Sequence, residues 1–171
     1  MFNGIIFNKG IINEIKKRTK GVNLFIKSSL KVSNKNLGIS ISCDGVCLTL
    51  ISYKNKTLEF YLSNETLAKS KFRNIKIGDE INLEQPLKFG DNISGHICQG
   101  HVDTVCSVKS IKKVDKSNIF EFKLTKSLKK QLVEKASILI NGVSLRRLKK
   151  MVCLFLLTMR ANMKKWKMKV I

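Results

Sequence analysis

One ten-residue stretch occurs twice in the sequence, and this duplication constrains the fold more than any other feature. Ser40 to Thr49 reads S-I-S-C-D-G-V-C-L-T, and Ser137 to Arg146 reads S-I-L-I-N-G-V-S-L-R, so equivalent residues lie 97 positions apart. Solenoid repeats recur at periods of about 20–50 residues. A longer period predicts two tandem copies of a small domain instead. We expect residues 1–92 to form the first unit and residues 93–171 the second.

Short strand-like runs separated by turn residues predict an all-β fold for each copy. Asp44-Gly45 and Asn141-Gly142 each stand between two apolar runs, which is typical of a tight hairpin because both turn positions must accept positive φ. The first copy has about six such runs and a helical turn that Asn64 would cap, which predicts a closed antiparallel Greek-key barrel. Pro86 and the residues up to Asn92 predict the joint between the copies.

Three further expectations concern the ends of the two copies. A strand is predicted to begin within residues 1–6, and Ser127 to Lys135 is predicted to be a short helix because its apolar residues share one side. The second copy is shorter than the first, since Asp44 to Thr66 spans 22 positions and Asn141 to Thr158 only 17. We therefore expect the second barrel to be incomplete, to diverge after about residue 145, and to lack a final strand.

Charge and cysteine content limit the possible partners. The formal net charge is +21 and the isoelectric point is near 10. The positive charge is mostly lysine, spread along the chain without an arginine-rich stripe, so neither nucleic acid nor a membrane surface is expected as a partner. The five cysteines and the absence of an export leader predict reduced thiols in the cytoplasm. The longest late apolar run, Met151 to Leu157, is too short to span a bilayer.

Six motifs in a fixed order resemble those of the α-type riboflavin synthase family over residues 1 to about 145. They are M-F-N-G-I-I, D-G-V-C-L-T, N-E-T-L, I-N-L-E, G-H-I-C-Q-G-H-V-D and S-I-L-I-N-G-V-S-L. The resemblance implies tandem six-stranded barrels, a homotrimer, and a reaction without metal or organic cofactor. In that reaction two molecules of 6,7-dimethyl-8-ribityllumazine exchange a four-carbon unit, giving riboflavin and 5-amino-6-(D-ribitylamino)uracil.

That chemistry needs a proton taken from the C7 methyl of one lumazine, a nucleophile added to C7 of the other, and two rings held face to face. By position in the family's motifs, His101 is the candidate proton-transfer group. Ser40 is a candidate source of the hydroxyl or water added at C7, and Cys47 and Thr49 complete the catalytic candidates. The resemblance implies that the catalytic cavity lies between the first barrel of one subunit and the second barrel of its neighbour.

The resemblance also implies a set of substrate-binding residues. Gly4, Ile5 and Ile6 would offer backbone groups to the heterocycle, and the run around Asn64 would bind the ribityl chain. The full implied set is Gly4, Ile5, Ile6, Cys47, Leu48, Thr49, Tyr61, Leu62, Ser63, Asn64, Glu65, Thr66, Gly100, His101 and Val102, with Lys135, Ser144, Leu145 and Arg146 for the second barrel. Arg146 departs from the pattern, because the first copy has Thr49 in the same place.

Other interpretations of these residues stay open. Cys47 is also compatible with a small buried apolar residue, Thr49 with an ordinary strand residue, and His101 with a core histidine. His96, Cys98, His101, Asp103 and Cys106 have side chains that suit zinc, but their spacing lacks a second tight ligand pair, so no metal is expected. Two other functions remain: a non-catalytic lumazine- or flavin-binding protein of the same fold, and a basic barrel that binds nucleic acid.

Overall fold

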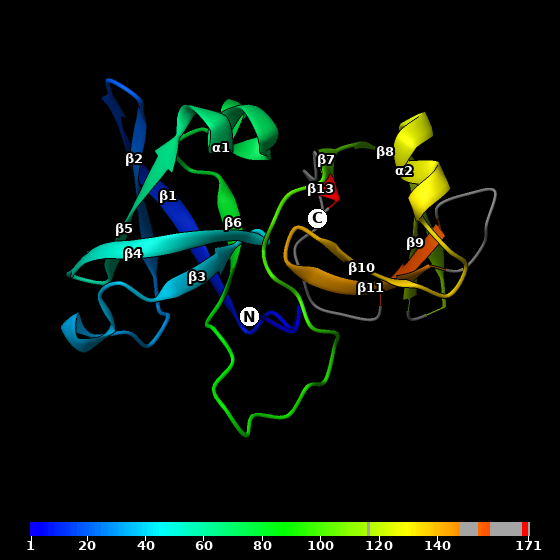
Figure 1. The fold of residues 1–171 in the computed structure, drawn as a ribbon, viewed down its shortest axis with the longest axis horizontal. Coiled ribbons are helices and arrows are strands. Elements are labelled where there is room, and N and C mark those ends of the chain that lie inside the picture. Colours follow the sequence, from blue (N-terminus) through cyan, green and yellow to red (C-terminus); the bar gives the residue numbers. More distant parts are fainter. Residues whose placement is uncertain (116, 148–153, 158–168, 171) are drawn as a thin grey trace.

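The computed structural model describes residues 1–115, 117–147, 154–157 and 169–170. Two β-structured units lie side by side, the first drawn in blue to green and the second in green to red (Figure 1). The long connection between them extends downward near the N-terminus in this view. The N-terminal segment runs between the two units, so the start of the chain contacts both.

The first unit is a closed six-stranded antiparallel barrel, which confirms the fold class expected from the sequence. The strands pair in the order β1-β2-β5-β4-β3-β6, and β6 closes the barrel by pairing with β1. Their bounds are β1 (Asn8–Arg18), β2 (Gly21–Ser28), β3 (Ser40–Cys43), β4 (Val46–Lys54), β5 (Thr57–Ser63) and β6 (Glu80–Glu84).

Alternation along the strands fills the inside of this barrel. Ile12, Leu24, Ile41, Leu50 and Phe60 are all fully buried in one apolar cluster. Burying one such side chain contributes about 1.5–3 kcal/mol, so this cluster is the main source of stability for the first unit. The hairpin between β3 and β4 turns at Asp44 (φ 47°) and Gly45 (φ 83°), as the sequence predicts.

The second unit repeats the strand order of the first. Its sheet runs β7-β13-β10-β11-β12-β9-β8, and β10, β11 and β13 occupy the places of β3, β4 and β6. The expectation that the final strand has no counterpart is wrong, because Lys169–Val170 pairs with both β10 and β7. In the described residues the two ends of this sheet, β7 and β8, are separated in the chain only by Cys106 and form one interrupted strand, so the second barrel is only partly formed compared with the first. The bounds are β7 (Thr104–Val105), β8 (Ser107–Val114), β9 (Ser117–Lys123), β10 (Ser137–Ile140), β11 (Val143–Arg147), β12 (Leu154–Leu157) and β13 (Lys169–Val170).

In the part of the chain that the structure describes, each unit has one short α-helix, and both helices begin after a residue with a hydroxyl side chain. The cap of α1 (Asn64–Lys69) is Ser63, whose Oγ accepts the Thr66 N–H at 3.1 Å, so the prediction that Asn64 caps it is wrong. Thr125 caps α2 (Lys126–Gln131) in the same way, and this helix ends earlier than predicted. Lys135 instead has φ 65°, which a helix cannot continue through. Two 3-10 turns complete the first unit, η1 (Asn34–Asn36) and η2 (Lys71–Asn74).

Residues 1–6 do not form the predicted strand. Phe2 makes an isolated bridge with Cys98, with hydrogen bonds of 2.8 and 2.9 Å in the two directions. Gly4 then takes φ 75°, which interrupts the extended backbone. The first barrel therefore begins at β1, and the segment before it is free to reach the second unit.

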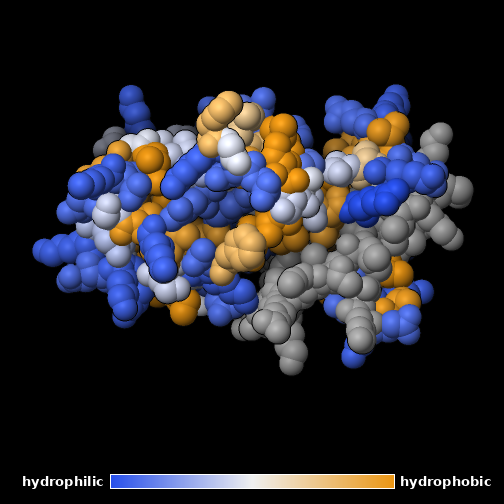
Figure 2. Space-filling model, turned by 90° about the horizontal axis from the view of Figure 1, so that it is seen from below, coloured by the Kyte–Doolittle hydropathy of each residue, from blue (hydrophilic) through white to orange (hydrophobic). Residues whose placement is uncertain are grey.

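Apolar side chains are exposed along the N-terminal segment and the joint. Phe7 is 87% exposed, Ile97 56% and Ile93 53%, and Phe89 is fully exposed. Figure 2, seen from below, shows apolar side chains near the middle of the molecule and further apolar patches toward both ends of a surface that is otherwise polar. No helix in the described part of the chain is long and apolar enough to cross a membrane.

Candidate functional site

The first part of the site forms where the segment after the joint reaches the start of β4. The Cys47 N–H donates to the Gly100 carbonyl at 3.0 Å. Gly100 has φ 82°, and a Cβ added to it would lie 2.7 Å from the Cys47 Cβ. Only glycine allows this approach, so the contact places Gly100, His101 and Val102 beside the first barrel.

The same contact occurs in the second unit with the roles of the two segments exchanged. The Ser144 N–H donates to the Gly4 carbonyl at 2.8 Å, and a Cβ added to Gly4 (φ 75°) would lie 2.7 Å from the Ser144 Cβ. The start of the chain, through Gly4, therefore binds to β11 of the second unit. The segment after the joint, through Gly100, binds to β4 of the first unit. Gly4 therefore lies directly beside Ser144.

The turns of the two units also meet at this interface. The side-chain amide of Asn82 donates to the Asn141 carbonyl at 2.9 Å, and a Cβ added to Gly142 would lie 3.0 Å from the Gly45 nitrogen. Both hairpins keep the same register, with Ser42 opposite Cys47 and Leu139 opposite Ser144. The two half-sites are consequently near-copies in backbone geometry.

His96 is a site residue that the sequence did not single out outside the metal interpretation. The imidazole Nδ1 of His96 lies 2.7 Å from the Ser144 Oγ. The backbone N–H of His96 donates to the Asn3 carbonyl at 3.2 Å. Burial lowers the pKa of His96, which favours the neutral imidazole. The repeated Gly-His pair, Gly95-His96 and Gly100-His101, was the available signal. His101, by contrast, is exposed.

The residues two positions beyond Cys47 and Ser144 are exposed on the same strand faces. Thr49 lies opposite Ser40 in the β3–β4 pair, and Arg146 lies opposite Ser137 in the β10–β11 pair. The structure thus brings Ser40, Cys47 and Thr49 together on one hairpin. Leu48 and Leu145 point the other way and are buried, 4% and 3% exposed, so a ligand could meet only their backbone.

The run from Tyr61 to Thr66 is divided by its own secondary structure. Leu62 is fully buried in the barrel core, and the Tyr61 hydroxyl donates to the Lys20 carbonyl at 2.8 Å. Ser63 and Thr66 cap the helix, while Asn64 is exposed. The exposed Glu65 bonds Lys69 at 2.6 Å, and this hydrogen bond lowers the pKa of Glu65. Lys135, on the second unit, is also exposed.

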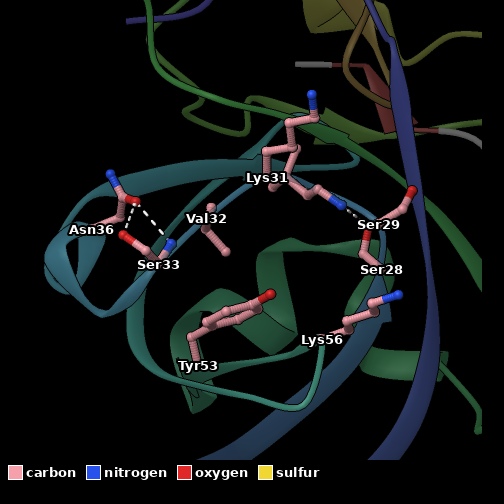
Figure 3. A pocket seen from close by; sticks show the side chains of 9 residues that line it. Ser28, Ser29, Lys31, Val32, Ser33, Asn36, Tyr53 and Lys56 are labelled. Atoms are coloured by element: carbon pink, nitrogen blue, oxygen red, sulfur yellow. Dashed lines mark hydrogen bonds between the residues drawn. The ribbon is translucent and has the colours of Figure 1, made fainter.

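Two other features bear on ligand binding. Within the described residues, no group of three or more His, Cys, Asp or Glu side chains could hold a metal ion. A surface hollow lies at the loop that follows β2, and Figure 3 shows Tyr53, Lys31 and Lys56 among the side chains that line it. None of the site residues expected from the sequence lines it. Its lining residues are Ser28, Ser29, Leu30, Lys31, Val32, Ser33, Asn36, Tyr53 and Lys56.

Thiol reactivity provides a direct test of this geometry. We expect iodoacetamide to modify Cys47 faster than the buried Cys43, Cys98 and Cys106. Desolvation raises the pKa of Cys43, and desolvation together with the nearby Glu84 raises the pKa of Cys98 to about 11, so both stay protonated and unreactive at pH 8. Peptide mass mapping in a Cys153→Ser background measures the rates. Faster labelling of Cys98 than of Cys47 would contradict the contact described here.

Comparison with known proteins was made on both sequence and structure. The family model described as "Lumazine binding domain" matches residues 3–86 and 99–154. The riboflavin synthase of Chlamydia pneumoniae is 38% identical over 146 residues, which is 85% of this chain and 71% of that protein. The riboflavin synthase of Bacillus subtilis (strain 168) is 32% identical over 85% of this chain and 67% of its own length.

Solved structures share the fold. The structure of LumP complexed with riboflavin has a TM-score of 0.74 and 22% identity, and covers 92% of this chain and 85% of that one. LumP complexed with 6,7-dimethyl-8-(1'-D-ribityl) lumazine has a TM-score of 0.72 at 22% identity and the same coverage. The shared architecture extends over both units.

Proposed function

The chain belongs to the lumazine-binding domain family and to the riboflavin synthases within it, and from this premise we propose that it converts two molecules of 6,7-dimethyl-8-ribityllumazine into riboflavin and 5-amino-6-(D-ribitylamino)uracil. The reaction is a four-carbon transfer, so the protein is a transferase. One observation carries the proposal: two half-sites of matching backbone geometry, Cys47 with Gly100 and Ser144 with Gly4, suit a reaction of two identical substrates.

The residues have distinct roles in this proposal. Each half-site holds one lumazine ring, and face-to-face placement of the two rings supplies up to about 10 kcal/mol of the barrier reduction. His101, exposed beside the Cys47 half-site, transfers the C7 methyl proton, while Ser40, Cys47 and Thr49 present hydroxyl and thiol groups to C7. Tyr61, Ser63, Asn64, Glu65 and Thr66 face the ribityl chain, and Lys135 and Arg146 serve the second ring. No metal or organic cofactor is required.

Assembly is part of the proposal. We place the catalytic cavity between the first barrel of one subunit and the second barrel of its neighbour in a homotrimer. The exposed Phe7, Phe89 and Ile97 support a subunit contact, since large apolar side chains lose their contact with water when a partner covers them. Residues 1–92 and 93–171 are the two lumazine-binding units, and the free thiols suit the reducing cytoplasm.

Riboflavin formation tests the proposal directly. Purified protein mixed with the lumazine should develop riboflavin fluorescence, and His101→Ala should slow turnover by about 10²–10⁴-fold because a proton-transfer group is lost. Lys35→Ala, at an exposed position in η1, is the control and should keep the parental rate. Equal turnover by His101→Ala and the parent would remove His101 from the proposed role.

A second function has a specific observation in its favour. Arg146 stands where the first hairpin has Thr49, so the two half-sites differ in charge and size at that position. A protein that binds lumazine or a flavin without converting it would tolerate such a difference. Lumazine binding measured by fluorescence titration, with no riboflavin formed over hours, would favour this second function over the first.

A further inference from the structure

Glu84, the last residue of β6, carries a buried carboxylate that faces backbone and not solvent. The residue is 8% exposed. Its Oε1 accepts the Asn3 N–H at 2.8 Å, and the Gly4 N–H lies 3.2 Å from Oε1 and 3.1 Å from Oε2. Burying an ionised carboxylate is costly unless donors surround it, so these contacts hold the N-terminal segment firmly against the first barrel.

These bonds fix the orientation of two consecutive peptide groups. With its N–H held by Glu84, Gly4 turns at φ 75° and directs its carbonyl at the Ser144 N–H, 2.8 Å away. The Asn3 side chain accepts the next N–H, from Ile5, at 3.1 Å, and the Asn3 carbonyl accepts the His96 N–H. A carboxylate on the first barrel thus orients the backbone that meets Ser144 and His96 in the second unit.

We propose that Glu84 is a positioning residue for the second half-site, one that sets the alignment of Gly4 to Ile6 against Ser144. This inference rests on the proposed function for its ligand. Both backbone groups of Gly4 already have partners, so the lumazine in this half-site meets Ile5 and Ile6, whose position depends on the Glu84 contacts. Glu84 itself acts on no reacting atom, because its oxygens are occupied by backbone donors.

Glutamine is the sharpest substitution at this position. Both oxygens of Glu84 contact backbone N–H groups, and Glu84→Gln replaces one of them by an NH₂ group that faces a donor. Glu84→Asp keeps the negative charge, but its side chain is one methylene too short for the carboxylate to reach the Asn3 and Gly4 N–H groups. Glu80→Gln is the matched control, because Glu80 begins the same strand, is exposed, and lies 3.8 Å from Lys9.

Two measurements on the full chain test the inference. Hydrogen exchange should show the Gly4 amide of Glu84→Gln exchanging at least tenfold faster than in the parent, at an unchanged unfolding midpoint. In a lumazine titration followed by NMR of the backbone amides, the affinity of the Ser144 half-site for lumazine should fall about tenfold in Glu84→Gln. The Cys47 half-site should keep its affinity. Glu80→Gln should behave as the parent in both.

The outcomes separate this inference from the proposed function. Unchanged Gly4 exchange in Glu84→Gln, or equal weakening of both half-sites, would overturn the positioning role. If Glu84→Gln does not fold, the Gly4 exchange rate and the two half-site affinities are measured on Glu84→Asp instead, and the same outcomes support or overturn the positioning role. If the parent binds lumazine but forms no riboflavin, the proposed synthase activity fails while the exchange and half-site measurements still test Glu84.

Discussion

Replacing Asp44 by alanine is expected to lower the free energy of unfolding by about 3–5 kcal/mol, the cost of breaking a buried ion pair by removing one partner. Asp44 is 1% exposed and pairs with Lys71 of η2. Its Oδ1 also accepts the Asn82 N–H at 2.7 Å, which ties the β3–β4 turn to β6. Alanine would lose both contacts and would be strained at φ 47°. Urea unfolding, with the midpoint and slope compared to the parent, measures the effect.

The second copy supplies the control for this prediction. Asn141 occupies the equivalent turn position with the same φ of 47°, so Asp44→Asn imports a residue that this turn geometry accepts. It keeps one acceptor for Asn82 and removes only the charge, so the expected loss is smaller, about 1–3 kcal/mol. Adding Lys71→Met completes a double-mutant cycle. Equal losses for Asp44→Ala and Asp44→Asn would show that the charge, and not the turn or the shared acceptor, carries the whole effect.

Replacing Gly100 by alanine is expected to lower kcat/KM for riboflavin formation by about 10²-fold, the cost of misplacing a reacting group by about 1 Å. The added Cβ would meet the Cys47 Cβ at 2.7 Å and the Cys47 nitrogen at 3.0 Å. The segment must therefore move away from β4, which separates His101 from the hairpin that carries Ser40, Cys47 and Thr49. Steady-state kinetics with purified lumazine measures the loss.

Gly90→Ala is the control variant that separates backbone strain from the collision with Cys47. It has φ 90°, close to the 82° of Gly100, but a Cβ added there would meet nothing within 4 Å. Gly90→Ala therefore carries a similar backbone strain of about 1–2 kcal/mol without the collision. Its kcat/KM should stay within about twofold of the parent. A comparable drop in both variants would mean that strain, and not the contact with Cys47, limits catalysis.

Features set by neighbouring residues were predictable from the sequence. The Asp44-Gly45 and Asn141-Gly142 turns follow from the need for positive φ at adjacent positions, and both lie in tight hairpins as predicted. The choice of helix cap was less determined. Ser63 and Asn64 can both cap, and only the backbone path decides which oxygen reaches a free N–H three residues on.

The sequence predicted the continuous run from Tyr61 to Thr66 as substrate-binding residues, but it could not show which of these side chains are accessible to a ligand. Strand alternation turns Leu62 into the barrel core between the exposed Tyr61 and the capping Ser63. His96 escaped notice for the opposite reason, because its partners Asn3 and Ser144 are far away in the chain. No local pattern specifies such a contact.

The sequence by itself determined that one β-unit occurs twice, that each copy consists of short strands, and that a tight hairpin carries Cys47 in the first copy and Ser144 in the second. These properties depend on turn chemistry and on alternation, which act over a few residues. Only the tertiary structure decided that Gly4 serves the second unit and Gly100 the first, because that exchange depends on close backbone packing and on one buried carboxylate, Glu84, reaching across 80 residues of chain.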